Sequence, residues 1–314
     1  MNRSNRYSIP IANKNKWYKK VLLNWQLYLL MLPGLCYYFF LEYLPIAGIQ
    51  IAFKNYNAMK GIWGSPWVGF KHFQRFFNSA YFSISILNTL RISIWSLAAG
   101  FICPIVFALM VNELRCRRVR SFVLSVSYAP HFISTVIIVG ILRIFTTPST
   151  GIINHIIAAL GGERIAFMQQ DTWFTPLYVL SGLWQELGWN SLIYVAALSG
   201  VDPALHESAL MDGANRVQRM WHINLPVLRP TIVILLILNC GQLMNVGYEK
   251  VLLMQTDANL AVSEVVSTYV YKAGLINAEF SFSAAINLFN SGINCILLII
   301  VNTIANKLDN TSLW

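Results

Sequence analysis

Charged residues are scarce in this chain of 314 residues. Only 11% of them are Asp, Glu, Lys or Arg, against about a quarter in an average soluble domain, while 56% are hydrophobic. So few charges cannot cover a surface that faces water on all sides. The composition therefore excludes an ordinary soluble domain and predicts an integral membrane protein.

Motifs that carry chemistry are missing as well. The sequence has no GxxxxGK[ST] loop to hold ATP phosphates and no GxSxG turn, and the HExxH-like string that opens at His206 fails because Leu210 stands where the second histidine belongs. The five cysteines have no CxxC spacing and predict neither a disulfide framework nor a metal site. We therefore expect no catalytic residue, no cofactor and no metal in this chain.

Long hydrophobic runs are what the sequence has instead. A run of about 20 apolar residues is the length that an α-helix needs to cross a bilayer. The sequence predicts an all-α membrane protein with six transmembrane helices in one domain, residues 25–306, between a basic tail (1–24) and a short tail (307–314). The runs lie at residues 25–44, 84–111, 121–145, 174–198, 227–246 and 282–305.

Basic residues outnumber acidic ones, with 23 Lys and Arg against 13 Asp and Glu. They sit beside the apolar runs, which favours a role in membrane topology over nucleic-acid binding. The short loop RCRRVR, residues 115–120, carries the strongest concentration between two runs. Positive residues gather on the inner side of membranes, so we expect a multi-pass cell-membrane protein in contact with lipid, with both termini in the cytoplasm.

The connection over residues 202–226 is unusually polar and reads HESALMDGANRVQRMWHINLP from position 206. Asp202 and Pro203 favour a helix start, because Asp caps free amide groups and Pro fits the first helical position. Gly213 permits a positive φ and a sharp turn, and we expect a second short helix over 215–223. Such a helix-turn-helix fits a groove on another protein, and the same residues also fit a loop that only caps its own bundle.

This connection resembles the coupling motif of binding-protein-dependent ABC importer permeases. The similarity lies in Glu207, Ser208, Ala209, Asp212, Gly213, Ala214, Ile223, Leu225 and Pro226, with Ser208 where the family prefers Ala. Further segments are similar to the sugar and polysaccharide branch, which includes maltose-type permeases. They are YLPIAGIQIAFKNYN (43–57), WVGFKHF (67–73), NTL (88–90), PHFIS (130–134) and GIINHIIAALG (151–161).

The resemblance implies a type I importer permease that forms half of a translocation pathway. Its partners would be a second, non-identical permease, two ATPase subunits that bind ATP and Mg, and an extracytoplasmic solute-binding protein. The loop would enter a cleft of the ATPase as a coupling helix, with Glu207 as the charged contact and Gly213 as the bend. The implied substrate is an oligosaccharide or a polysaccharide fragment.

Polar side chains within the apolar runs are expected to line a pathway. In the fourth run, Trp184, Gly188 and Ser191 share one helix face, where an indole beside a glycine gap offers a platform for a sugar ring. Amides in the fifth and sixth runs suit sugar hydroxyls, and they equally suit bonds between helices. These amides are Asn239, Gln242, Asn245, Asn287 and Asn290.

Ionisable side chains within the runs need partners, since an unpaired charge is costly in a bilayer. Glu186 lies in the outer half of the fourth run, and we expect it to pair with Arg91 or Arg143. His131 follows Pro130 and is expected to pack at a helix kink rather than to bind a metal.

Three other functions fit parts of the sequence. An amino-acid or peptide ABC importer would share the coupling motif, so only the resemblance outside that motif favours sugar. A secondary transporter would need an ion-coupling site and usually inverted repeats, and neither is evident in the sequence. A membrane scaffold would tolerate replacement of the polar residues in the fourth and fifth runs.

Overall fold

The computed structural model describes residues 23–309 and 313 of the chain. The chain forms two compact units, Met1–Gln50 and Ile51–Trp314. Nearly all of the predicted basic tail and part of the predicted C-terminal tail lie outside the described residues.

The described residues of the first unit form one long apolar helix, which continues along the chain to Phe53. It begins as α2 (Trp25–Tyr37), widens into the π-helix η2 (Tyr38–Tyr43) and ends as the 3-10 helix η3 (Leu44–Phe53). Its only charged residue is Glu42. With 29 residues, it is long and apolar enough to cross a membrane. The first predicted span is therefore helical throughout.

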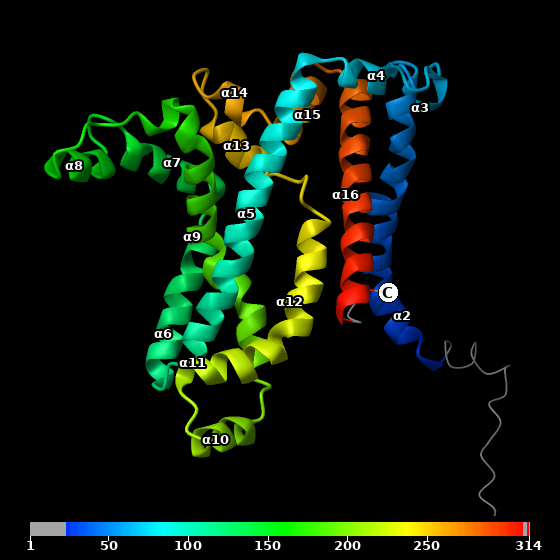
Figure 1. Cartoon of the computed structure of the whole chain (residues 1–314). Helices are drawn as coiled ribbons and strands as arrows, with labels where there is room; N and C mark the ends of the chain where they lie inside the picture. The colour runs from blue at the N-terminus through cyan, green and yellow to red at the C-terminus, as the bar shows by residue number, and fades with distance from the viewer. Residues whose placement is uncertain (1–22, 310–312, 314) are drawn as a thin grey trace, which may run out of the picture. The chain divides into compact units, whose positions relative to one another are not determined.

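Four long helices build the second unit (Figure 1). Its most extensive helix contact joins α5 (Ala80–Asn112) to α9 (Asp171–Leu198), and α12 (Leu225–Cys240) packs against α16 (Phe280–Asp309). A buried apolar cluster joins three of these helices through Ala108, Leu109, Tyr194, Leu198 and Leu228.

The number of helices that are long and apolar enough to cross a membrane is lower than the six that the sequence predicts. Among the described residues, four helices are long and apolar enough to cross, and a bent helix pair raises the number to five. The predicted fourth span lies within α9, which is helical over 28 residues but is not one of these. The count of six stays a prediction.

The predicted third span, 121–145, is not one straight helix. α6 (Arg117–Tyr128) and the short η4 (Ala129–Phe132) meet α7 (Thr135–Thr146) at an angle of 97°. Ile133 and Ser134, between them, have extended backbone. Because Pro130 donates no backbone hydrogen bond and restricts its predecessor, the helix ends within a turn of it.

Short helices cover the end of the second unit that lies opposite α10 (Figure 1). The motif NTL joins α5 to them: the Asn88 amide donates to the carbonyls of Ala261 and Glu264, and Thr89 Oγ1 accepts from the Val266 amide. These helices are α3 (Gly61–Gly64), α4 (Lys71–Phe77), α13 (Tyr248–Met254), α14 (Leu260–Ser263), α15 (Val266–Tyr271) and η7 (Lys272–Ile276), while α8 (Ile152–Ala159) follows α7.

The predicted fifth span ends early. α12 stops at Cys240, and residues 241–247 are turns and irregular backbone before α13. Gln242 and Asn245 therefore lie on non-helical backbone. The directions of their side chains do not follow the spacing of a helix.

Candidate functional site

The coupling segment begins as the sequence predicts. Asp202 caps α10 (Pro203–Met211) by accepting from the Ala204 amide at 2.9 Å, and Pro203 occupies the first turn. Gly213 turns the chain with a φ of 79°, a conformation that an L side chain adopts only with strain.

The second helix of the segment differs from the prediction, because it is not a separate element. α11 (Arg216–Arg219), with a capping box between Asn215 and Gln218, passes through the π-helix η6 (Met220–Asn224) directly into α12. The Leu225 amide bonds to the Met220 carbonyl, five residues back. Such a wide turn accommodates Pro226, which has no amide hydrogen and crowds an ordinary helix.

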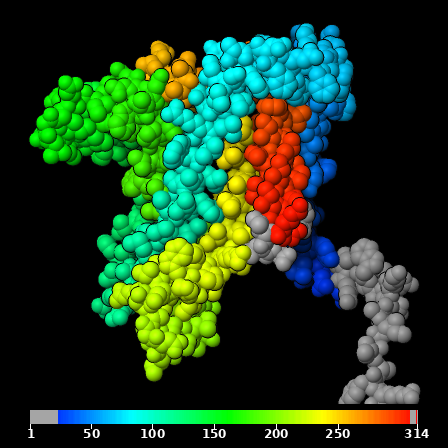
Figure 2. Space-filling view, viewed as in Figure 1, coloured from blue at the N-terminus to red at the C-terminus, as the bar shows by residue number. Residues whose placement is uncertain are grey.

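The segment protrudes from the second unit and offers an unburied surface (Figure 2). Glu207, Ser208 and Asp212 are exposed, and Ala209 and Ile223 are half-buried. Large apolar side chains are exposed beside them: Leu205, Leu210, Met211, Val217 and Trp221. Such an apolar surface with a few charges is typical of a protein interface.

Between α10 and the following helix lies a hollow of about 320 Å³, lined by Ala209, Asp212, Gly213, Ala214, Gln218, Arg219, His222 and Ile223.

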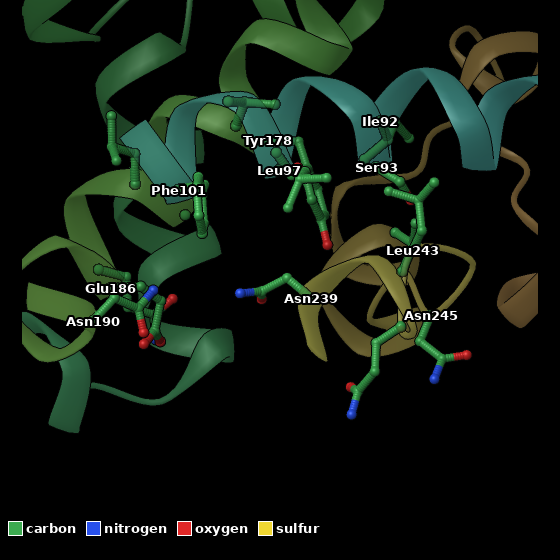
Figure 3. Close-up of a pocket in the computed structure, with 18 of the residues that line it drawn as sticks. Ile92, Ser93, Leu97, Phe101, Tyr178, Glu186, Asn190, Asn239, Leu243 and Asn245 are labelled. Carbon is green, nitrogen blue, oxygen red and sulfur yellow. The ribbon is translucent and has the colours of Figure 1, made fainter. Parts of the chain in front are cut away.

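A cavity of about 410 Å³, with both polar and apolar residues in its lining, opens between α5, α9, the end of α12 and the chain that follows it. Figure 3 shows Asn239 and Asn245 on one side of it and Glu186 and Asn190 on the other, beneath α5. Amide, hydroxyl and charged groups thus share the space with apolar surface. Its polar lining consists of Ser93, Ser96, Tyr178, Gln185, Glu186, Asn190, Asn239, Gln242, Asn245 and Lys250.

A small amide network supports one wall of the cavity. Asn245 Oδ1 accepts from Asn290 Nδ2 at 3.1 Å and from Asn294 Nδ2 at 3.0 Å, and Asn294 Oδ1 accepts from the Met244 amide at 3.0 Å. The irregular backbone after α12 is thereby tied to α16. Of the predicted amides, Asn239, Gln242 and Asn245 line the cavity, and Asn290 supports it from behind. Asn287 is exposed and away from it.

The predicted face of α9 turns out to be a packing face. A Cβ on Gly188 would lie 2.2 Å from the Ser127 carbonyl oxygen of α6, so this glycine allows close helix contact. Ser191 is fully buried and donates to the Gly188 carbonyl, and Trp184 is exposed outside the cavity. The neighbouring face of α9, with Gln185, Glu186 and Asn190, lines the cavity, and the three predicted residues do not. Sugar binding at the predicted face stays a prediction.

Glu186 also has a different partner from the one predicted. Its Oε2 lies 2.9 Å from His131 Nδ1, and the His131 ring stacks on Trp189 at 4.2 Å. The prediction of an Arg91 or Arg143 pair is wrong, since Arg143 donates to the Leu253 carbonyl. His131 does lie at the helix break, as predicted, but as the partner of a carboxylate.

Lys250 is a charged residue of the cavity lining that the sequence does not reveal. No pattern in the sequence distinguishes it from a lysine on an exposed connection. The one signal is its place at the end of the segment GQLMNVGYEK, residues 241–250, which follows α12 and is rich in glycine and amides.

Together, the apolar helices, the protruding coupling segment with its exposed surface and the cavity between the helices are the features expected of a membrane transport protein. Residues 100–309 match the family of binding-protein-dependent transport system inner membrane components. The chain belongs to this family, and it is a permease subunit of an ABC importer rather than an enzyme.

Relatives and solved structures agree with this family. The chain is 42% identical to the polygalacturonan/rhamnogalacturonan transport system permease protein YteP of Bacillus subtilis (strain 168), over 94% of this chain and 92% of the relative. It is also 42% identical to protein LplB of the same organism, over 92% and 91%. A crystal structure of a bacterial ABC transporter involved in the import of the acidic polysaccharide alginate contains a chain that is 36% identical, with a TM-score of 0.86 over 94% of this chain and 100% of that one.

Proposed function

We propose that this permease carries oligosaccharides or polysaccharide fragments across the membrane. The observation that supports this most directly is the cavity, where amides from three elements converge beside apolar surface. Sugars present hydroxyl groups around an apolar ring, and amides offer both donors and acceptors to hydroxyls. The relatives, one of which is described as a polygalacturonan/rhamnogalacturonan permease, support the same substrate class.

The chain works as half of a pathway in this proposal, with a second, non-identical permease as the other half. A related alginate transporter has been solved in complex with a periplasmic protein that holds an alginate pentasaccharide. By similarity, an extracytoplasmic binding protein delivers the sugar here, and two ATPase subunits bind ATP and Mg. The exposed coupling segment, with Glu207 and Gly213, is the surface that engages the ATPase.

The membrane orientation is part of the same proposal. The basic loop 115–120 and the coupling segment lie at the same end of the second unit, and the aromatic α4 (Lys71–Phe77) lies at the other (Figure 1). Basic residues gather at the cytoplasmic side. We place the coupling segment and both termini in the cytoplasm and the short helices outside.

The test is ATP hydrolysis by the reconstituted complex with its binding protein, against a panel of oligosaccharides, amino acids and peptides. We expect an oligosaccharide to stimulate hydrolysis, and the double substitution Glu207→Ala, Gly213→Pro to abolish this stimulation. Stimulation by a peptide or an amino acid, and by no sugar, would overturn the substrate class. Normal stimulation in the double variant would overturn the role of the segment.

A further inference from the structure

Lys250 occupies an unusual position for a lysine in a membrane protein. Its side chain, on α13, is 9% exposed and reaches the cavity wall formed by α9. Nζ donates to the Tyr178 carbonyl oxygen at 3.1 Å and lies 4.7 Å from the centre of the Tyr178 ring. A Cβ on Gly182 would lie 3.2 Å from Nζ, so the missing side chain at this position leaves room for the ammonium group.

The charge of Lys250 is not matched by a carboxylate. Among the residues that the structure describes, no Asp or Glu oxygen lies within ion-pair distance of its Nζ. Glu186 faces it through the cavity but is bound to His131. An ammonium has three hydrogens, and one is given to the Tyr178 carbonyl. A buried cation with unused donors is costly unless an anion reaches it.

The surroundings of the ammonium group indicate which anion fits. Asn239, Gln242 and Asn245 line the same cavity with neutral donors and acceptors. An inorganic anion or an acidic amino acid would leave most of these amides unused. A sugar acid uses both kinds of group, because its carboxylate accepts charge-assisted bonds from an ammonium while its hydroxyls bond to amides.

We infer that Lys250 is a specificity-determining residue that selects uronic-acid oligosaccharides, whose carboxylate it binds in the cavity, over neutral ones. The inference rests on the proposed function and sharpens it, since it names one charged group on the sugar and one residue that binds it. Lys250 also ties α13 to α9 through Tyr178, so the test must separate binding of an anion from helix packing.

The experiment compares a trigalacturonate with its fully methyl-esterified form, which keeps the sugar rings and loses the charges. Uptake of both is measured in proteoliposomes that hold the whole complex, with one saturating binding protein throughout. The variants are Lys250→Gln and Lys250→Arg, and the matched control is Lys60→Gln, which removes a positive charge from an exposed position. Because the binding protein is the same in each case, a changed ratio of acid to ester uptake reports on the permease.

We expect the wild type and Lys60→Gln to prefer the acid, and Lys250→Gln to lower the acid-to-ester ratio by about tenfold or more, the loss of one charge-assisted bond. Lys250→Arg, which keeps the charge, should retain most of the ratio. An unchanged ratio in Lys250→Gln, or a wild type that prefers the ester, overturns the inference while sugar transport stands. Gly182→Ala gives an independent check, since it pushes on the ammonium without removing it, and an unaltered ratio there also counts against the inference.

Failure of the proposed function looks different. In that case the wild type takes up neither form of the sugar, and a solute of another class is transported. If Lys250→Gln fails to assemble with its partners, the ratios for Lys250→Arg and Gly182→Ala decide the matter.

Discussion

Arg219 lies beside Glu113, with 3.6 Å between Nη2 of the arginine and Oε2 of the glutamate. Their side chains are 11% and 17% exposed, so water screens the pair little. Glu113 is the C-terminal cap of α5, where the helix dipole is negative and a cation is favourable. The pair thus joins the coupling segment to a helix whose other residues line the cavity.

Breaking this pair should weaken coupling between the ATPase and the pathway. Glu113→Gln and Arg219→Gln each leave one shielded charge without its partner, and a coupling loss of about 1–3 kcal/mol, or about 5- to 150-fold, is expected. The measurement is the ratio of sugar-stimulated to basal ATP hydrolysis. The exchange Glu113→Arg with Arg219→Glu should recover part of it, and full coupling in both single variants would rule the connection out.

The effect of a substitution at Gly213 should depend on how readily the new residue adopts a positive φ, and not on the size of its side chain. Its φ is 79°, and a Cβ would meet no atom within 4 Å. Alanine therefore costs about 1 kcal/mol of backbone strain, and asparagine costs less, because it visits this conformation more readily. Co-purification of the ATPase should fall in the order Gly, Asn, Ala, Val. Gly200→Ala is the control, since its Cβ meets only an ordinary contact at 3.5 Å.

At Gly188 the size of the side chain should decide the outcome, and any side chain should be harmful. Its Cβ would lie 2.2 Å from the Ser127 carbonyl oxygen, so Gly188→Ala must push α9 away from α6. We expect a loss of about 1–3 kcal/mol in stability, seen as a lower thermal midpoint in detergent. Gly140→Ala on α7 has open space around its Cβ and should be neutral or slightly stabilising. Equal midpoints for the two variants would contradict the close contact.

These residues also show where sequence reasoning succeeds. The start of α10 and the turn at Gly213 depend on local chemistry, namely an Asp-Pro pair and the freedom of glycine, so the sequence alone predicts them. The face of α9 that lines the cavity depends on which neighbours pack against it. Both faces carry polar residues and a tryptophan, so the choice between Ser191 and Asn190 could not be made without α6.

The cavity position of Lys250 and the partner of Glu186 were missed for a related reason. Their environments come from elements distant in sequence: α9 reaches Lys250 from residue 178, and His131 reaches Glu186 from the break between α6 and α7. A sequence pattern reports a charge and its neighbours along the chain. It does not report that a connection folds back to place a lysine in a cavity.

The preference for acidic sugars should depend on pH through Lys250. Burial lowers the pKa of this lysine from 10.5 to about 8, and Glu186 on α9 opposes part of the shift. The other titratable or charged groups on the helices that pack against α13 are Asp171, Tyr178 and Tyr194 on α9, Arg143 on α7, and Tyr269 and Tyr271 on α15. The ammonium form prevails below the pKa and the neutral amine above it, while sugar carboxylates stay ionised throughout. The acid-to-ester uptake ratio should therefore fall from pH 7 to pH 9 in the wild type by up to about tenfold, the change in the fraction of Lys250 that carries a charge. In Lys250→Arg the guanidinium stays charged, so the ratio should stay level over the same interval. A wild-type ratio that does not change with pH would show that the charge on Lys250 does not contribute to selection.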